Sequence, residues 1–268
     1  MKLYAISDLH IGHAENLAFV KTVQGQPEDW LILAGDLGEQ VKELITVLEL
    51  VTPRFAKVFW VPGNHELWAT RHEGPRGEAK YQGLVETCRR YGVVTPEDPY
   101  VAWPEAEALV IAPMFLLYDY SFRPASVARE NAIAWAAEQR SVCSDEAVLD
   151  PSPYPSREAW CAARVAATEQ RLAQLPAGTS TILVNHFPLR QSHAILPAIP
   201  RFAMWCGTVL TDEWHRRFRA KVVVYGHLHL PRTFHEDGVA FEEVSLGYPR
   251  ERARRGPPAM RLIWPRPA

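Results

Sequence analysis

Short apolar runs alternate with longer amphipathic segments along the chain. Between the first three runs, the segments near 14–24 and 39–52 have helical spacing, for instance at Val41, Leu44 and Leu48. Short apolar runs of this kind predict strands that are buried on both faces. Strands separated by helices are typical of βαβ units, so we expect an α/β protein whose core sheet begins as a parallel one. The predicted strands are 2–7, 30–35, 57–62, 108–113, 180–185 and 221–226.

The closing section of the chain has a different pattern. Residues 232–247 place Asp237 and Gly238 between two extended runs, which predicts a hairpin. Residues 259–264 are a further strand candidate. We therefore expect a second, more antiparallel sheet that packs on the first.

Residues 114–179 are predicted to be an insertion. Helical stretches near 125–139 and 157–174 are separated there by a proline-rich loop. No repeat, low-complexity tract or linker divides the chain, so we predict a single domain over residues 1–268.

The composition is that of an ordinary globular protein. Of the 268 residues, 47% are hydrophobic and 22% are charged, and the net charge is −2, so no overall basic field favours nucleic acid as a partner. No apolar stretch is long enough for a membrane span, and the first residues lack the pattern of a signal peptide. The four cysteines form no CxxC pair, which indicates reduced thiols in a cytoplasmic protein.

The charges are unevenly distributed along the chain. From Arg201 onward there are 12 Lys and Arg against 7 Asp and Glu, a net of +5, which leaves 17 against 24, a net of −7, for the first 200 residues. The acidic N-terminal part disfavours a nuclease. The basic residues cluster at 216–221 and 250–255, and two interpretations stay open: a solvated face with a basic tail, or a patch for an acidic partner.

Polar side chains with metal-binding chemistry follow five of the predicted strands. Taken singly, each has an ordinary structural explanation, such as a helix cap for Asp8 or a satisfied core histidine for His186. The carboxyl ends of parallel strands converge on one crevice, however, and five of the ten histidines of the chain stand at these ends, so we expect one shared site. The residues are Asp8 and His10, Asp36, Asn64 and His65, His186, and finally His227 and His229.

This donor set predicts two metal ions. Carboxylate oxygen, amide oxygen and imidazole nitrogen without thiolate suit Mn, Fe or Zn, and seven candidate ligands exceed what one tetrahedral ion takes. Asp36 follows the central strand of the first three and is the expected bridging ligand. His227 and His229 are two residues apart, so in an extended segment they would point the same way and serve adjacent ions.

The charge of such a centre favours a phosphoryl group as substrate. Two divalent ions, opposed by Asp8, Asp36 and a bridging hydroxide, leave a charge of about +1. The two ions can hold the attacking oxygen and the phosphoryl oxygens together. Phosphoester hydrolysis is therefore favoured over peptide hydrolysis.

The five motifs DLH, GD, GNHE, NH and GHLH resemble, in this order, those of the calcineurin-like metallophosphoesterases. The resemblance implies a four-layer α-β-β-α sandwich of two mixed β-sheets flanked by helices, with two divalent or trivalent metal ions, Mn and Fe before Zn. It assigns His65 and Asn64 to substrate binding, and His65 to assisting the leaving group beside the bridging Asp36. In many members of this family the second motif extends to a later aspartate and arginine. Here the segment reads GDLGEQ and lacks both, which weakens an assignment as a protein Ser/Thr phosphatase. The implied ligands are Asp8, His10, Asp36 and His229 for one ion, and Asp36, Asn64, His186 and His227 for the other.

Longer phrases, such as FAKVFWVPGNHELW and FEEVSLGYPRE, resemble a bacterial subgroup of this family that includes enzymes removing 4′-phosphopantetheine from carrier proteins. The resemblance implies a phosphodiesterase with an acidic carrier protein as substrate. A small-molecule or nucleotide phosphoester stays open as substrate, and so does a non-catalytic scaffold. Aromatic residues are expected either to line a groove for the arm or to pack in the core. They are Trp68, Phe115, Tyr118, Tyr120, Phe122, Trp160 and Trp205.

Overall fold

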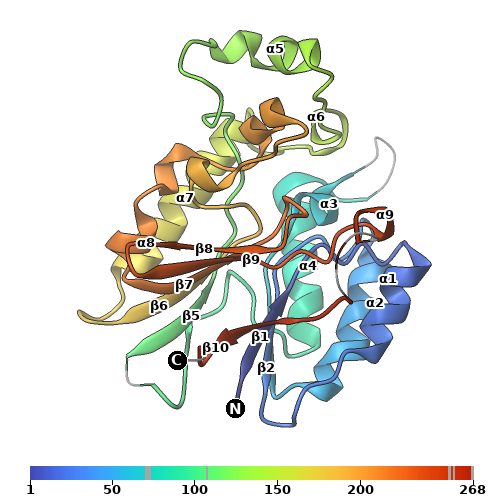
Figure 1. Ribbon diagram of the computed structural model, residues 1–268, viewed down its shortest axis with the longest axis vertical. Coiled ribbons are helices and arrows are strands. Elements are labelled where there is room, and N and C mark those ends of the chain that lie inside the picture. The colour runs from blue at the N-terminus through green and yellow to red at the C-terminus, as the bar shows by residue number, and fades with distance from the viewer. Residues whose placement is uncertain (70–73, 107, 253–254, 256, 267–268) are drawn as a thin grey trace.

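Two β-sheets pack face to face in the computed structural model, which describes residues 1–268 except 70–73, 107, 253–254, 256 and 267–268 (Figure 1). In the first sheet, β1, β2 and β3 pair in parallel, and β10 pairs antiparallel with β1. The parallel start predicted from the βαβ pattern is therefore confirmed. The strand order is β10 (Arg261–Trp264), β1 (Leu3–Ile6), β2 (Trp30–Leu33) and β3 (Lys57–Trp60).

The second sheet is more parallel than the sequence predicts. β5, β6, β7 and β9 pair in parallel, and only the edge strands β4 and β8 are antiparallel. The expected hairpin joins β8 and β9, with Asp237 and Gly238 at φ values of 54° and 75° in its turn. The prediction of a more antiparallel sheet is wrong because β9 crosses over to pair with β7, while the last strand joins the first sheet. The order is β4 (Val101–Ala102), β5 (Leu109–Pro113), β6 (Ser180–Val184), β7 (Ala220–Tyr225), β9 (Val239–Glu243) and β8 (Arg232–Glu236).

Alternation along the strands explains the layers. Ala5, Ile32 and Phe59 of the first sheet contribute to the core between the sheets, together with Ile182 and Val222 of the second. Their neighbours along each strand point to the opposite face and pack against helices. Both faces of each sheet are covered in this way, which is why the strands read as continuous apolar runs.

Helices cover the outer faces of both sheets (Figure 1). On the first sheet lie α1 (Ala14–Thr22), α2 (Val41–Val51) and α4 (Gly77–Arg90); on the second lie α7 (Arg157–Ala173) and α8 (Trp214–Arg217). The helix α4 was not predicted, although its buried Tyr81, Leu84 and Cys88 recur at helical spacing. Among the described residues, no helix is long and apolar enough to span a membrane.

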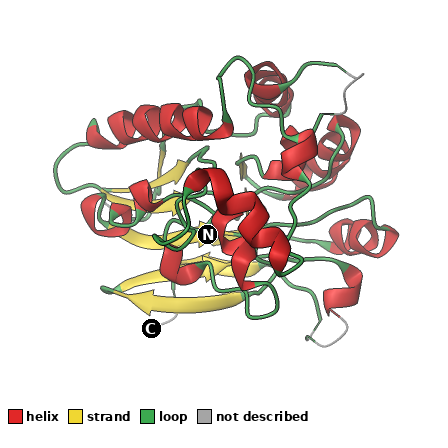
Figure 2. Ribbon diagram, turned by 90° about the horizontal axis from the view of Figure 1, so that it is seen from above, coloured by secondary structure: helices red, strands yellow, loops and turns green. Residues whose placement is uncertain are grey.

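A cap of short elements lies beyond the carboxyl ends of the strands. It consists of α5 (Ala132–Glu138), α6 (Asp145–Val148) and the 3-10 turns Gln191–His193, Pro200–Trp205 and Val209–Thr211. Seen from above, short helices lie in front of the strands (Figure 2). The predicted helix near 125–139 is shorter than expected, because a loop and a 3-10 turn precede α5. The small helices α3 (Asn64–Leu67) and α9 (Pro249–Arg252) stand at the same end of the sheets.

Candidate metal centre

The strand ends turn sharply toward one point. After their strands, five of the predicted ligands adopt positive φ values, between 40° and 70°, that L-residues rarely adopt. The segment with His227 and His229 is therefore not extended, and the expectation that they point the same way is wrong. The two imidazoles instead face different groups of ligands. The five residues are Asp8, His10, Asp36, His227 and His229.

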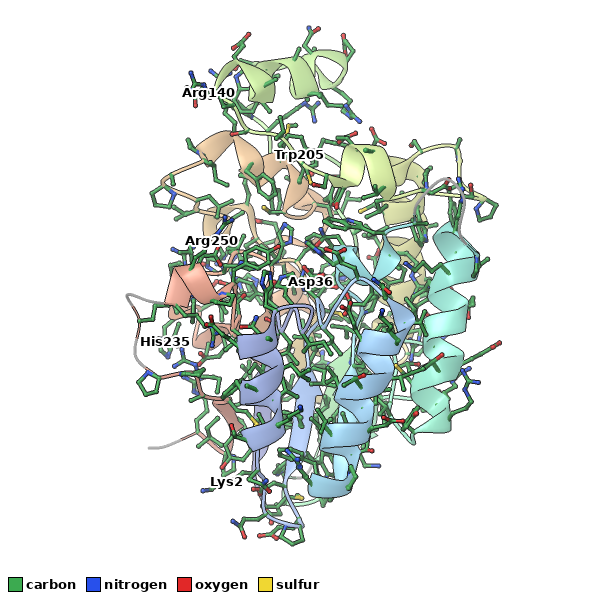
Figure 3. The ribbon with its side chains drawn as sticks, turned by 90° about the vertical axis from the view of Figure 1, so that its right-hand side faces the viewer. Lys2, Asp36, Arg140, Trp205, His235 and Arg250 are labelled. Atoms are coloured by element: carbon green, nitrogen blue, oxygen red, sulfur yellow. The ribbon has the colours of Figure 1, made fainter. Side chains whose placement is uncertain are left out.

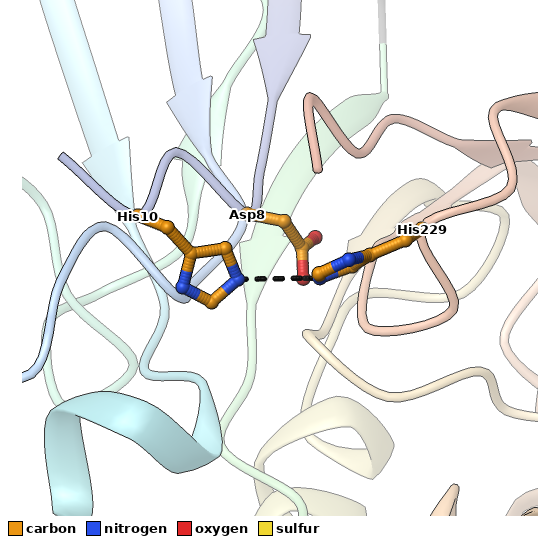
Figure 4. A group of neighbouring side chains, drawn as sticks. All are labelled: Asp8, His10 and His229. Carbon is orange, nitrogen blue, oxygen red and sulfur yellow. Dashed lines mark hydrogen bonds and ion pairs between the residues drawn. The ribbon is translucent and has the colours of Figure 1, made fainter. Parts of the chain in front are cut away.

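Asp8, His10 and His229 form the first group of metal-ligating atoms (Figure 4). The His229 Nε2 lies 3.0 Å from the Asp8 Oδ1 and 3.2 Å from the His10 Nε2. Asp8 is fully buried, and His10 is only 5% exposed. A carboxylate and two imidazole nitrogens thus converge on one position.

Asp36, His186 and His227 form the second group. The His186 Nε2 lies 3.3 Å from the Asp36 Oδ2, and both side chains are buried. Asn64 follows Gly63 at the start of α3, and its Nδ2 donates to the Asp145 Oδ1 at 3.0 Å. In the part of the chain that the structure describes, the Asn64 Oδ1 has no hydrogen-bond partner.

Asp36 connects the two groups. Its ligand atom also lies within 4.8 Å of those of His10 and His65. The Asp36 Oδ1 accepts the backbone N–H of His65 at 2.9 Å. Gly63 is required for this approach, because a Cβ there would stand 2.0 Å from the Asp36 Oδ1. The position between the groups is the one that a bridging ligand needs.

The donor atoms fit metal ions. Three buried atoms, the Asn64 Oδ1, the His186 Nε2 and the His227 Nε2, have no hydrogen-bond partner among the described residues. Buried polar atoms are normally paired, so three such atoms without a partner beside the ligand groups indicate a place for a cation. The donors are the oxygen and nitrogen types that Mn, Fe and Zn accept.

Partners on the outer side of the ligands fix their orientation. The His186 Nδ1 donates to the Ala34 carbonyl at 2.9 Å, and the His229 Nδ1 donates to the Glu251 Oε2 at 2.7 Å. Each of these bonds leaves the Nε2 lone pair of its histidine for a metal. Glu251, on α9, was not predicted, because its distance of 22 residues from His229 follows no motif.

Glu66 holds the loops that carry the second group. Its carboxylate accepts the backbone N–H groups of Asp36, Leu37 and Gly63 at 2.7–2.9 Å. Burial, and then the charge of Asp36, raise the pKa of Glu66 to about 8. The residue is part of the GNHE motif, but the sequence does not reveal its role in joining two strand ends.

Asp8 has its own set of donors. The hydroxyls of Ser7 and Ser245 donate to the Asp8 Oδ2 at 2.5 and 2.7 Å, and the His227 N–H contacts both carboxylate oxygens. Gly226 is required here, because a Cβ would lie 2.3 Å from the Asp8 Oδ2. Ser245 follows β9, so the second sheet also orients a ligand of the first.

Burial and charge act in opposite directions on the histidines. Burial lowers the pKa of His10 to about 4 and, with the charge of His186, that of His227 to about 3. Burial would also lower the pKa of His186 and His229, but neighbouring carboxylates outweigh it and raise both to about 10. In the metal-free protein, two imidazolium ions therefore supply positive charge where metal ions would supply it.

His65 stands at the mouth of the site. Its Nε2 lies 3.8 Å from the Asp36 Oδ2, its Nδ1 lies 3.5 Å from the Glu39 Oε1, and its side chain is 12% exposed. The ring packs on Trp68 with a centroid distance of 3.7 Å. The residue is accessible to a ligand, while Asp36 lies deeper.

A cavity of about 270 Å³ opens over the two groups. Trp68, Phe202 and Tyr248 line it, together with Val142 and Ile199 from the cap region. Of the aromatic residues predicted as groove candidates, only Trp68 lines this cavity. The others are at most 3% exposed and pack in the core, so the groove interpretation is wrong for them; they are Phe115, Tyr118, Tyr120, Phe122, Trp160 and Trp205.

Comparisons with known proteins agree with the fold. The chain is 50% identical over 271 residues to the [acyl-carrier-protein] phosphodiesterase PptH of Mycobacterium tuberculosis (strain ATCC 25618 / H37Rv), an alignment that covers 99% of this chain and 84% of that protein. The crystal structure of phosphopantetheinyl hydrolase (PptH) from Mycobacterium tuberculosis matches with a TM-score of 0.95 and 50% identity, over 99% of this chain and 96% of that one.

The match at the level of the family covers most of the chain. The calcineurin-like phosphoesterase profile aligns with residues 1–231. The predicted fold class, two mixed sheets flanked by helices, is confirmed, and so is the predicted class of metal-dependent phosphoric ester hydrolase. The chain belongs to the calcineurin-like phosphoesterase family.

Proposed function

We propose that this protein is a phosphodiesterase that removes 4′-phosphopantetheine from a holo carrier protein by hydrolysing the phosphodiester to serine. The observation that carries the reaction class is the meeting of two ligand groups at Asp36, beside buried polar atoms that have no hydrogen-bond partner among the described residues. The substrate rests on the 50% identical relative, whose name assigns it to acyl carrier protein.

Two ions are held by the seven predicted ligands in this proposal. Asp8, His10 and His229 hold the first, and Asn64, His186 and His227 hold the second, with Asp36 shared between them. Once bound, the ions activate a water molecule and neutralise the phosphoryl oxygens. The hydrogen bonds that the ligands donate to Glu251, Ala34 and Asp145 supply the pre-organised orientation that such a centre requires.

His65 and Asn64 contact the phosphate in this proposal. His65 lies at the mouth, beside the buried Asp36, where the leaving serine oxygen would emerge. Its imidazole donates a proton or a hydrogen bond to that oxygen. Packing on Trp68 and the nearby Glu39 carboxylate limit the orientations of the ring.

The direct test is incubation of the Mn²⁺-loaded protein with a purified holo carrier protein. Mass spectrometry should detect apo carrier and free 4′-phosphopantetheine, and the Asp36→Asn variant should produce neither. If only a small diester, such as bis(4-nitrophenyl) phosphate, is cleaved, the carrier substrate is rejected and the alternative of a small-molecule phosphodiesterase stands. If neither is cleaved and fewer than one ion binds per chain, the enzymatic proposal fails.

A further inference from the structure

The mouth of the metal centre has two unlike sides. The basic segment 250–255, left unassigned by the motifs, lies in part on α9, beside the centre. On another side stands the apolar margin of the cap. We propose that α9 and this margin together form the surface on which an acidic carrier protein docks, an inference that rests on the function proposed above.

The chemistry of the substrate requires a docking surface at this place. The diester phosphorus is bonded directly to a serine oxygen of the carrier. When the phosphate reaches the buried Asp8 and Asp36, the carrier backbone stands only one side chain away from it. Residues around the mouth must then contact the protein surface next to that serine.

The segment of α9 is attached to the metal centre by two contacts. The Tyr248 ring stacks on His10 with a centroid distance of 4.5 Å, and the Glu251 Oε2 accepts the His229 Nδ1–H. Arg250 follows Tyr248 directly and is exposed to solvent. The side chain of Arg250 thus lies just outside the ligand group of the first ion.

The arginines of this segment are not neutralised locally. No carboxylate among the described residues forms an ion pair with Arg250, whose guanidinium lies 5.6 Å from the Tyr248 ring centroid. Arg252 donates to the Asn16 Oδ1, and Arg255 donates to the His229 carbonyl. Residues 253, 254 and 256 lie outside the described residues. This segment thus carries three guanidinium groups and the Glu251 carboxylate, which already binds His229, while Glu15 and Glu39 line one cavity with Arg250.

The cap side of the mouth is apolar and exposed. Val142, Leu196, Ile199 and Phe202 line the cavity. Val142 is 74% exposed and Ile199 is 41% exposed, which is unusual for aliphatic side chains beside a polar site. An exposed apolar margin beside polar and charged residues is typical of a protein-binding surface.

The third side of the mouth determines the orientation of the partner. Glu39, at the entrance to α2, is 58% exposed beside His65, so it repels an acidic surface. Glu39 lines one cavity with Arg250, so carboxylates of the carrier contact Arg250 on the side away from Glu39, while its apolar residues contact Val142 and Ile199. Charge complementarity of this kind acts on the rate of encounter and weakens with salt.

The first test reverses the charge of Arg250. In the Arg250→Glu variant, we expect KM for the holo carrier to rise about ten-fold at low ionic strength with unchanged kcat, and the difference to shrink at about 0.5 M salt. Turnover of bis(4-nitrophenyl) phosphate should be unchanged. Lys2→Glu is the matched control: it makes the same charge change near the lower end of the molecule in Figure 3, away from Arg250, and should leave both substrates unaffected.

The second test removes the apolar contact without adding charge. Val142→Ser should raise KM for the holo carrier about three- to five-fold. Leu210→Ser, at an aliphatic side chain that is 52% exposed and does not line the cavity, is its control.

Three outcomes overturn the docking proposal. If the Arg250 and Val142 variants both have the wild-type KM for the carrier, the docking proposal is rejected and the proposed function stands. If the variants lose as much activity toward the small diester as toward the carrier, these residues act on the metal centre itself. A wild-type enzyme that cleaves the small diester but leaves the holo carrier intact rejects the proposed function, and the docking proposal with it.

Discussion

Substitution of Asp145 tests whether the cap orients a metal ligand. Its Oδ1 accepts the Asn64 Nδ2 at 3.0 Å and the Trp68 Nε1 at 2.6 Å, and the residue is fully buried at the start of α6. The bond to Asn64 directs the amide oxygen toward the second ligand group. In the Asp145→Ala variant, the amide loses the partner that holds it in this orientation.

The expected magnitudes follow from these contacts. A buried donor left without an acceptor costs about 1–3 kcal/mol, and this applies to Asn64; the half-buried Trp68 can recruit water, so its loss is smaller. Burial raises the pKa of Asp145, so removing its carboxylate also removes an unfavourable desolvation. We expect a net destabilisation of about 1–4 kcal/mol. Loss of an orienting partner lowers metal affinity about 10–100-fold, or about 1.4–2.7 kcal/mol.

Calorimetric titration of the metal-free protein with Mn²⁺, together with urea unfolding, measures both quantities. Asp145→Ala should weaken one of the two binding steps and leave the other unchanged, because the group around Asp8 does not touch Asp145. Asp145→Asn keeps an oxygen acceptor for both donors and should bind both ions with nearly wild-type affinity. Two wild-type binding steps in Asp145→Ala would refute the role of Asp145 as the residue that orients Asn64.

Three further predictions concern the centre itself. Asp36→Asn should abolish turnover and lose metal measured by elemental analysis, whereas His65→Ala should keep both ions and lose about 10²–10⁴-fold in rate; a metal-free His65→Ala protein would contradict its assigned role. Metal binding should release about two protons at pH 7, since His186 and His229, with pKa raised to about 10, must become neutral; calorimetry in buffers of different ionisation enthalpy would detect fewer if this is wrong. The same raised pKa values stabilise the metal-free fold fully below pH 6.5, so its unfolding free energy should fall between pH 7 and 10.

The order of polar residues after apolar runs was sufficient to predict which side chains lie close together. Asp36 and His186 are far apart in sequence, but parallel strands bring their ends to one edge, and the side chains lie 3.3 Å apart. That inference depends only on which strands are parallel. The inference holds although the prediction for the second sheet was wrong, because β6 and β7 are parallel in the structure.

Partners of the ligands could not be predicted, because they come from segments without periodicity. Asp145 lies 81 residues from Asn64, in a loop-rich cap, and nothing in its sequence neighbourhood indicates burial. Glu251 reaches His229 only because β9 returns the chain to the strand ends. The extended geometry expected for His227 and His229 failed because the strand ends at Tyr225, and both residues adopt left-handed conformations beyond it.

The left-handed conformations explain why such a site depends on its ions. Five ligands have φ values between 40° and 70°, and each such residue costs on the order of 1–2 kcal/mol relative to ordinary backbone. These turns fold the side chains back over the strand ends, and they bring Asp8 and Asp36 together with unpaired lone pairs of His227 and Asn64. Neither the strained backbone nor the unpaired polar atoms stabilise the metal-free fold. Coordination of cations would offset both, so the free energy of unfolding should rise with metal concentration as it does for a ligand that binds only the folded protein.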